Sequence, residues 1–253
     1  MIKISWSRFD SYDKCRLQYA LRYIDRVKMP INRSSFLVGS VVHDTIKEWA
    51  FNGYPQNFVV ARATQNFNSM SHGMPLTTDV RRTKLKQTIK GALLASKVYQ
   101  EEKFGEHHAV VEQRFEVQPP VFPSFLKLIG GYDVYDPQTR IVYDLKMHTT
   151  QNYSDFRQLL TYAVALATIG EPVSQGGYIT PLLKQRVDLR PISNDDILEH
   201  ANVLVEAGTA MELQNFDRVP MVGRQCYFCE FNRTSYCPAT VGAKDDNSLI
   251  DQA

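Results

Sequence analysis

The sequence predicts an α/β domain with a mixed central sheet flanked by helices, and three observations carry this prediction. Residues 109–117 alternate apolar and polar side chains, which is the period of a half-buried strand. Residues 130–146 form two apolar runs around a short turn, as a β-hairpin does. Helical patterns at residues 154–169 and 194–213 are interleaved with further strands. This order of elements is typical of a mixed sheet with helices packed against it.

The composition is that of a folded protein and excludes a largely disordered chain. Of 253 residues, 43% are hydrophobic and 22% are charged. The net charge of +2 is too small to predict nucleic-acid binding by itself, so such a surface would need local clustering of basic residues. The N-terminus is charged where a signal peptide is apolar, and no long apolar run follows. We therefore expect a cytoplasmic protein that does not contact a membrane.

Most of the first hundred residues are expected to be helical, with helices at residues 5–24, 36–51, 58–67 and 79–104. Ser5 or Ser7 can cap the first helix, which places Cys15 in its middle. Gly39 and His43 are four residues apart and share one face of the second helix, where the glycine leaves room beside the imidazole. His43 fits either a packed histidine or a metal ligand at this point.

A basic stripe runs along the helix expected at residues 79–104. Arg82, Lys86 and Lys90 recur every four residues and therefore lie on one face. Such a stripe can follow a phosphate backbone. A solvated helix face is the alternative interpretation.

The hairpin at residues 130–146 predicts a metal site. If Asp136 pairs with Ile141, the same register sets Asp133 opposite Asp144, with β-carbons about 5 Å apart. Lys146 projects on the same side as Asp144, because strand side chains alternate. Two carboxylates this close repel unless they share a proton, a cation or a metal ion. We therefore expect a divalent metal site with a lysine beside it.

The helix at residues 154–169 is followed by two predicted strands, at residues 177–183 and 185–190. On this helix Gln158 and Tyr162 are four residues apart and share a face. Taken alone, such a pair is usually a surface polar group and a half-buried ring.

The four cysteines point to metal ligation. Cys226 and Cys229 form a CxxC pair, Cys237 follows eight residues later, and Cys15 is the remaining thiol. Disulfides are rare in a reducing compartment, whereas this spacing is common in metal knuckles. A four-thiolate site would tie the first helix to the last segment. Sulfur ligands serve both zinc and iron–sulfur clusters, so both remain open.

In order along the chain, these motifs resemble the RecB-like branch of the PD-(D/E)XK nuclease superfamily. The series is Gly39-x-x-x-His43, Gly130-x-x-Asp133, Asp144-x-Lys146 and Gln158-x-x-x-Tyr162, bracketed by Cys15 and by Cys226, Cys229 and Cys237. Within that branch the chain is most similar to the iron–sulfur nucleases, namely the AddB nuclease domain and the CRISPR-associated and phage-borne RecB-type exonucleases. The resemblance covers residues 5–238.

The resemblance implies one nuclease domain over residues 1–243, with a loose tail at 244–253. Its parts are a helical segment at 5–104, a restriction-endonuclease-like core at 109–190, and a C-terminal helix with cysteines at 194–238. The implied metal ligands are His43, Asp133, Asp144 and the backbone carbonyl of Leu145. Lys146 is the implied catalytic lysine, which Gln158 and Tyr162 help to position. The implied role of Cys15, Cys226, Cys229 and Cys237 is to hold a 4Fe–4S cluster that joins the two ends of the domain.

The implied function is a metal-dependent exonuclease of DNA recombination or repair that prefers single strands and works 5′ to 3′. Oxygen ligands suit Mg²⁺ or Mn²⁺, and an imidazole is compatible with Mn²⁺ in particular. Arg82, Lys86 and Lys90 are the candidate DNA contacts. The rival from another class is a non-catalytic DNA-binding or adaptor subunit that keeps the fold. The sequence identifies no protein partner.

Overall fold

The computed structural model describes residues 1–29, 36–52, 55–147, 155–183 and 187–239. Its centre is a six-stranded mixed sheet in which β1, β3, β4, β5 and β6 are neighbours in that order, while β2 pairs with β3. The strands are β1 (Ile2–Ile4), β2 (Val110–Val117), β3 (Leu126–Asp136), β4 (Ile141–Leu145), β5 (Gln175–Ile179) and β6 (Val187–Pro191). β1–β3 and β4–β5 are parallel, and the other pairs are antiparallel. The predicted α/β class with a mixed sheet is therefore confirmed.

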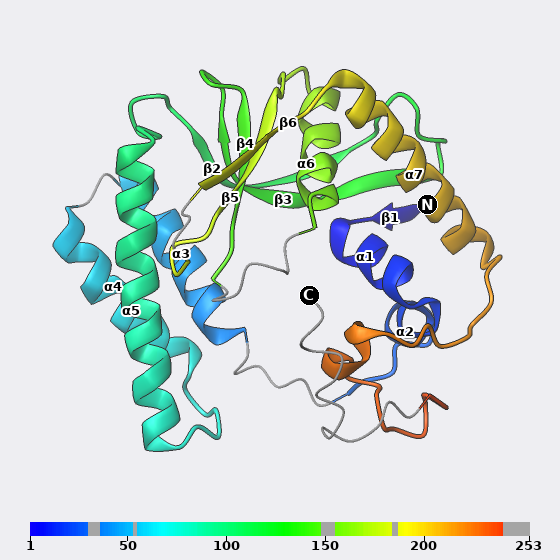
Figure 1. Ribbon diagram of the computed structural model, residues 1–253, viewed down its shortest axis with the longest axis horizontal. Coiled ribbons are helices and arrows are strands. Elements are labelled where there is room, and N and C mark those ends of the chain that lie inside the picture. Colours follow the sequence, from blue (N-terminus) through cyan, green and yellow to red (C-terminus); the bar gives the residue numbers. More distant parts are fainter. Residues whose placement is uncertain (30–35, 53–54, 148–154, 184–186, 240–253) are drawn as a thin grey trace.

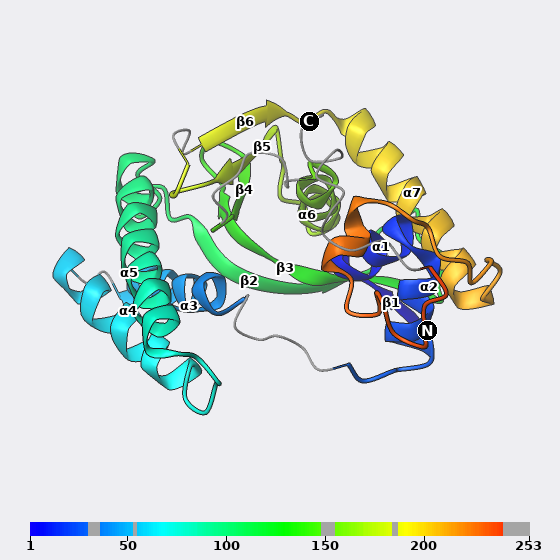
Figure 2. The ribbon, with the colours of Figure 1, turned by 60° about the horizontal axis from the view of Figure 1, so that its bottom comes forward.

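Helices cover the sheet in two groups (Figures 1 and 2). One group, at one end of the sheet, contains α3 (Leu37–Asn52), α4 (Gln56–Met70) and α5 (Thr78–Glu101). The other group contains α1 (Trp6–Lys14), α2 (Arg16–Tyr19), a π-helical turn (Ala20–Ile24), α6 (Arg157–Thr168), α7 (Asn194–Leu213) and the 3₁₀-helical turn η4 (Arg224–Phe228). No helix in the described ranges combines the length and the apolar character that crossing a membrane requires.

Strand β4 is buried on both faces because the two helical groups pack against opposite sides of it. Tyr143 and Leu145 belong to the core formed with α3, α4 and α5, whereas Val142 packs with Leu159 and Leu166 of α6. This alternation follows from the period of two along a strand. It explains why β4 is an almost continuous apolar run, as is typical of strands covered on both sides.

The sequence pattern predicted one continuous helix with Cys15 in its middle, and this prediction is wrong, because the helix is broken at Cys15. Ser5 caps α1 as expected, with its hydroxyl accepting from the Arg8 backbone N–H at 3.3 Å. Cys15 itself has an extended backbone (φ −164°, ψ 108°) and separates α1 from α2. Its sulfur accepts from the Gln18 backbone N–H at 3.5 Å and so caps the second helix. The break is local and leaves the apolar periodicity unchanged, which is why that periodicity did not reveal it.

The two predicted strands after α6 are shifted. β5 begins earlier, at Gln175, and ends at Ile179, and β6 runs from Val187 to Pro191. Gly176 and Gly177 weaken the strand pattern in sequence, but they allow close packing here, since a β-carbon at either position would press against Leu159 or Leu189. The tail predicted at residues 244–253 and the segment 184–186 lie outside the described residues.

Candidate metal centre and active site

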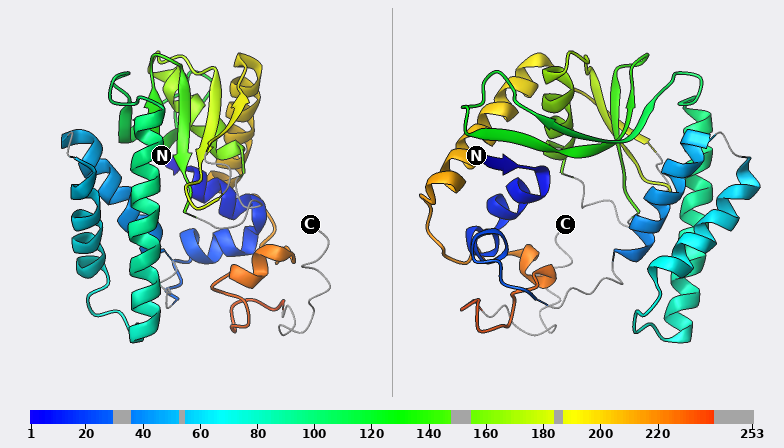
Figure 3. Two further views of the ribbon diagram at one scale, coloured as in Figure 1. Left: turned by 60° about the vertical axis from the view of Figure 1, so that its left-hand side comes forward. Right: turned by 180° about the vertical axis from the view of Figure 1, so that it is seen from behind.

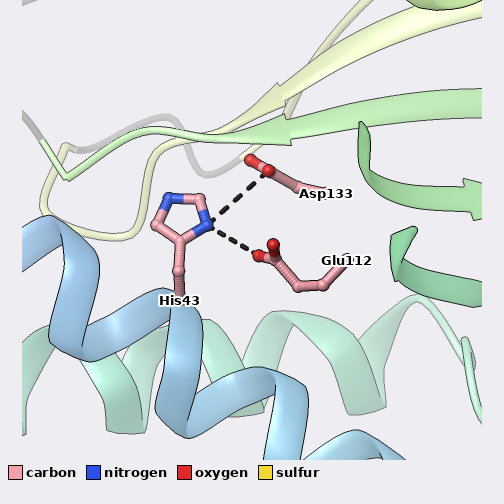
Figure 4. A group of neighbouring side chains, drawn as sticks. All are labelled: His43, Glu112 and Asp133. Atoms are coloured by element: carbon pink, nitrogen blue, oxygen red, sulfur yellow. Dashed lines mark hydrogen bonds and ion pairs between the residues drawn. The ribbon is translucent and has the colours of Figure 1, made fainter. Parts of the chain in front are cut away.

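Three side chains from three elements form a candidate metal-ligand group: His43 of α3, Glu112 of β2 and Asp133 of β3 (Figure 4). His43 Nδ1 lies 2.7 Å from Glu112 Oε1 and 3.6 Å from Asp133 Oδ1. One ligand atom from each residue lies within 4.8 Å of the others. One imidazole and two carboxylates are a donor set that fits Mn²⁺ and, with more water, Mg²⁺. The residues present therefore fit a divalent cation.

Glu112 is the functional candidate that the sequence interpretation missed. The alternation of β2 placed it among outward polar residues, together with Arg114 and Glu116. The register pairs Val111 with Val134 and so sets Glu112 opposite Asp133. Its φ of 51° is left-handed, which in a non-glycine residue costs about 1–3 kcal/mol and often marks functional sites. The available signal was its position opposite Asp133, and using it required the β2–β3 register.

Strand β3 also departs from regular alternation at Asp133. Tyr132 and Val134 are two residues apart and would share one face of a regular strand. Instead Tyr132 packs in the core beneath α6, whereas Val134 packs in the core with α3 and α5. The strand therefore turns over at Asp133. This distortion, with that at Glu112, lets β2 and β3 meet a histidine from α3.

The predicted hairpin register is confirmed. Asp136 pairs with Ile141 and Val134 pairs with Tyr143, where the observed pairing ends; continued by one residue, the same register would set Asp133 opposite Asp144. Asp133 Oδ2 accepts from the Leu145 backbone N–H at 2.6 Å. The Leu145 carbonyl, a predicted ligand, lies 3.0 Å from His43 Nε2 and therefore borders the metal-ligand group.

Asp144 is the centre of a second set of contacts, the Asp144 network, which also contains Lys146, Gln158 and Tyr162. Asp144 is 2% exposed, and its Oδ2 lies 2.7 Å from Lys146 Nζ. Its Oδ1 accepts from Gln158 Nε2 at 2.7 Å and from the Tyr162 hydroxyl at 3.0 Å. Lys146 Nζ also donates to Gln158 Oε1 at 2.8 Å. The fold thus brings both predicted pairs, Asp144–Lys146 and Gln158–Tyr162, to one point.

The electrostatics show a site that lacks positive charge. Burial, followed by the nearby Asp144 carboxylate, raises the pKa of Asp133 to about 8. Burial opposes a charged imidazole, but Asp133 and Glu112 outweigh it and raise the pKa of His43 to about 9. Both ring nitrogens of His43 face acceptors, Glu112 and the Leu145 carbonyl, as an imidazolium requires. Protons therefore supply the charge that a divalent cation would supply when bound.

A sequence profile described as the PD-(D/E)XK nuclease superfamily matches residues 3–238. The chain belongs to this superfamily. Its crystal-structure neighbours include a protein from Eubacterium rectale described as a "putative exonuclease", with a TM-score of 0.54 and 13% identity, covering 99% of this chain and 94% of that one. Another is SSO0001, with a TM-score of 0.37 and 15% identity, covering 82% of this chain and 97% of that one. No curated protein sequence matches the chain significantly.

The matched range of this PD-(D/E)XK chain contains Asp133 and the series Asp144-Leu145-Lys146, which the sequence interpretation predicted as the motif that names the superfamily. The fold of the Eubacterium rectale protein, at 13% identity, agrees with the family assignment. Membership implies a nuclease that acts on DNA with divalent metal ions, and the metal-ligand group provides side chains for such an ion.

The basic stripe of the PD-(D/E)XK chain is exposed, as predicted. Arg82, Lys86 and Lys90 lie on the solvent side of α5. Lys86 and Lys90 border a shallow apolar depression of about 390 Å³ lined also by Ile89, Leu93 and Leu94. Met147, which follows β4, packs onto Gly91 of the same helix, where a β-carbon would collide with its methyl group. The basic stripe therefore lies on the same helix, α5, that Met147 contacts at the end of the hairpin.

The four thiols do not form a metal-holding group within the part of the chain that the structure describes. The C-terminal segment does lie against the N-terminal helices (Figure 3). Glu230 pairs with Arg22 at 2.6 Å, and Gln225 donates to the Lys14 carbonyl at 3.0 Å. Burial, with a smaller contribution from Cys15 nearby, raises the pKa of Cys229.

The other two thiols face elsewhere. The sulfur of Cys226 lies 3.9 Å from the Met221 carbonyl, and that of Cys237 lies 3.7 Å from the Ala239 carbonyl. The N-terminal helices and the C-terminal segment are therefore in contact, as predicted. The four sulfur atoms do not form one cluster among the described residues. Each sulfur has a local backbone contact in its place.

Proposed function

We propose that this protein is a metal-dependent DNA exonuclease of the RecB-like branch. The observation that carries the proposal is that two acidic residues near the end of the hairpin, Asp133 and Asp144, each contact a different set of candidate functional groups. Asp133 belongs to the metal-ligand group, and Asp144 holds Lys146 at 2.7 Å. The Asp144 carboxylate helps to raise the pKa of Asp133, and a pure DNA-binding module gains nothing from two acidic residues that repel each other in this way.

His43, Glu112 and Asp133 would hold a Mg²⁺ or Mn²⁺ ion, with Asp144 and the Leu145 carbonyl next to them. When bound, such an ion neutralises charge on the phosphodiester and makes water a stronger acid. The donor set supports this role, since the raised pKa values of His43 and Asp133 show that the site favours added positive charge.

Lys146 is the group that acts on the reacting atoms. Its side chain is 27% exposed, and its ammonium contacts both Asp144 and Gln158. A lysine in this position can orient the attacking water or stabilise negative charge that develops on the phosphate. Burial, followed by Asp144 and then Asp133, raises the pKa of Tyr162 well above its ordinary value. The phenol therefore stays neutral and keeps donating to Asp144, which fixes the carboxylate that positions Lys146.

The finer parts of the proposal are a preference for single-stranded DNA, 5′-to-3′ polarity and a role in recombination or repair. They are supported by the order of the motifs from Gly39 to Tyr162, which is similar to that of RecB-type exonucleases. Arg82, Lys86 and Lys90 would bind the phosphate backbone outside the active site, because all three are exposed on one helix face.

The decisive experiment compares the purified protein with its Asp144→Ala variant on 5′-labelled and 3′-labelled DNA, single- and double-stranded, with Mn²⁺ or Mg²⁺. Asp25→Ala is the matched control, since Asp25 is a surface carboxylate paired with Arg218. We expect Asp144→Ala to abolish cleavage and Asp25→Ala to retain it. If the wild-type protein cuts neither single- nor double-stranded DNA with either metal, the enzyme proposal is wrong, and an adaptor that only binds DNA is favoured. The labels report the polarity.

We further propose that the four cysteines hold an iron–sulfur cluster; they are Cys15, Cys226, Cys229 and Cys237. Its support is the contact of Glu230, next to Cys229, with Gln18 of α2 and with Arg22 of the π-helical turn. The four thiols fit such a cluster only in part, so no catalytic step is assigned to it. Iron and zinc analysis of anaerobically purified protein tests it, with a Cys229→Ser variant as control. We expect about four iron atoms per chain. A colourless, zinc-loaded protein would replace the cluster with a zinc knuckle.

A further inference from the structure

A pocket of about 580 Å³ opens beside the metal-ligand group. His43 and Glu112 form part of its lining, and Phe36, Val38 and Met147 contribute apolar side chains. This volume is in the range of pockets that enclose small organic ligands. The polar part of the lining, with Asp44 and Glu112 beside His43, is acidic and therefore suits a cation that would in turn hold a phosphate, whereas the apolar part suits the flat face of a base.

Phe36 is 66% exposed although phenylalanine is usually buried. It lies immediately before α3 and seven residues before His43, so the two are about 10 Å apart along the helix axis and on nearly the same face. That separation is within the reach of a nucleotide next to the one whose phosphate lies at the metal-ligand group. Bases stack on aromatic side chains in single-stranded complexes, with little dependence on base identity.

Gly39 gives an independent indication that this space is used. A β-carbon at Gly39 would meet no atom within 4 Å, so packing does not require a glycine. Its backbone is helical, so no unusual backbone angle requires a glycine either. A glycine inside a helix costs about 1 kcal/mol relative to alanine. Its effect is to leave the pocket wall between Phe36 and His43 bare.

We propose that Phe36 stacks on an unpaired nucleobase and that Gly39 leaves room for the strand between this base and the metal-ligand group. The inference rests on the proposed function and deepens it, because it names the feature that selects the substrate. A base paired inside a duplex presents both faces to its neighbours, whereas an unpaired base can offer a face to Phe36. The preference for single-stranded DNA would then originate at this pocket.

The test measures cleavage and binding of a labelled single-stranded oligonucleotide by Phe36→Ala and Phe36→Trp. Leu213→Ala is the matched control, since Leu213 is 68% exposed at the end of α7. Loss of one stacked base corresponds to a rise of about 5- to 150-fold in KM, with kcat retained. Phe36→Trp should restore KM. On an oligonucleotide with abasic sites near the scissile bond, the wild type and Phe36→Ala should become equal.

Binding in EDTA, followed by fluorescence anisotropy, separates the two proposals. If the wild type cuts DNA but Phe36→Ala behaves like Leu213→Ala, or loses affinity equally for abasic DNA, the stacking inference is wrong and the nuclease proposal stands. The opposite result is that the wild type never cuts DNA, while Phe36→Ala lowers the affinity for normal DNA and leaves the affinity for abasic DNA unchanged. The nuclease proposal then fails and the stacking site stands.

Discussion

Replacing Asp133 by asparagine should change how the stability of the metal-free protein depends on pH. The substitution removes the titrating group but keeps an oxygen that can accept from the Leu145 N–H, as Asp133 Oδ2 does at 2.6 Å. In the wild type, burial and the Asp144 carboxylate raise the pKa of Asp133 to about 8. In the unfolded chain an aspartate has a pKa of about 3.9. The folded protein therefore holds a proton that the unfolded chain releases.

The sign and size of the effect follow from this difference. Between about pH 4 and pH 8 the unfolded state binds fewer protons, so the free energy of unfolding falls as the pH rises. One proton gives a slope of about 1.4 kcal/mol per pH unit, or about 3 kcal/mol over two units. His43, whose pKa its carboxylate neighbours raise to about 9 against the effect of burial, adds a fall of the same sign above its unfolded value. Asparagine at 133 removes the first contribution and reduces the second.

Urea unfolding in EDTA at several pH values measures this effect, and Asp25→Asn serves as the control for an exposed carboxylate. We expect the wild type and the control to lose about 2–3 kcal/mol more than Asp133→Asn between about pH 5 and pH 7. Added Mn²⁺ should restore the stability of the wild type, because a ligand that binds only the folded state stabilises it, and should leave the variant unchanged. If the free energy of unfolding depends on pH in the same way for the wild type and Asp133→Asn, the inference that folded Asp133 keeps its proton up to about pH 8 is wrong.

Three further predictions concern single positions. Gly39→Ala should raise the free energy of unfolding by about 0.5–1 kcal/mol in urea titrations and yet lower kcat/KM on single-stranded DNA, because the helix gains while the pocket narrows; equal or higher activity would contradict this. Lys146→Met should lower kcat by about 100-fold or more while the Mn²⁺-induced rise in Tm persists, and a lost Tm shift would make the lysine structural. Burial, and next the charge of Arg157, lowers the pKa of His200 to about 4. The folded imidazole thus stays neutral while the unfolded one takes up a proton, so about 3 kcal/mol of stability should be lost from pH 6.5 to pH 4, and His200→Gln should flatten that decline.

Local patterns were enough to predict the hairpin and its register. The register of β3 and β4 depends on a short turn and on apolar alternation, both of which are local properties. The same holds for Gln158 and Tyr162, because the helix period alone places them on one face. Their contact with Asp144, at 2.7 and 3.0 Å, follows once α6 packs on β4.

Glu112 and Cys15 could not be predicted in this way, because each departs from the pattern around it. Glu112 sits in an alternating strand with a left-handed φ of 51°, and the β2–β3 pairing that brings it to His43 joins segments that a long loop separates. Cys15 breaks a helix whose apolar period continues through the break. Local propensity gives no signal for backbone conformations that tertiary contacts impose.

Asp133 and Asp144 contact different groups, and the contacts of Asp144 limit how it could also bind a metal ion. Oδ1 of Asp144 accepts hydrogen bonds from Gln158 and Tyr162, whereas its buried Oδ2 lies 2.7 Å from the Lys146 ammonium and accepts no hydrogen bond from the described residues. If Asp144 also turns an oxygen toward an ion beside Asp133, one of these contacts must weaken. Tyr162 and the Oδ1 side are buried, whereas the Lys146 side chain is 27% exposed and keeps Gln158 as a second partner. Lys146 is therefore the most accessible partner of Asp144, and its ammonium is the group that a phosphate bound beside the metal-ligand group would meet.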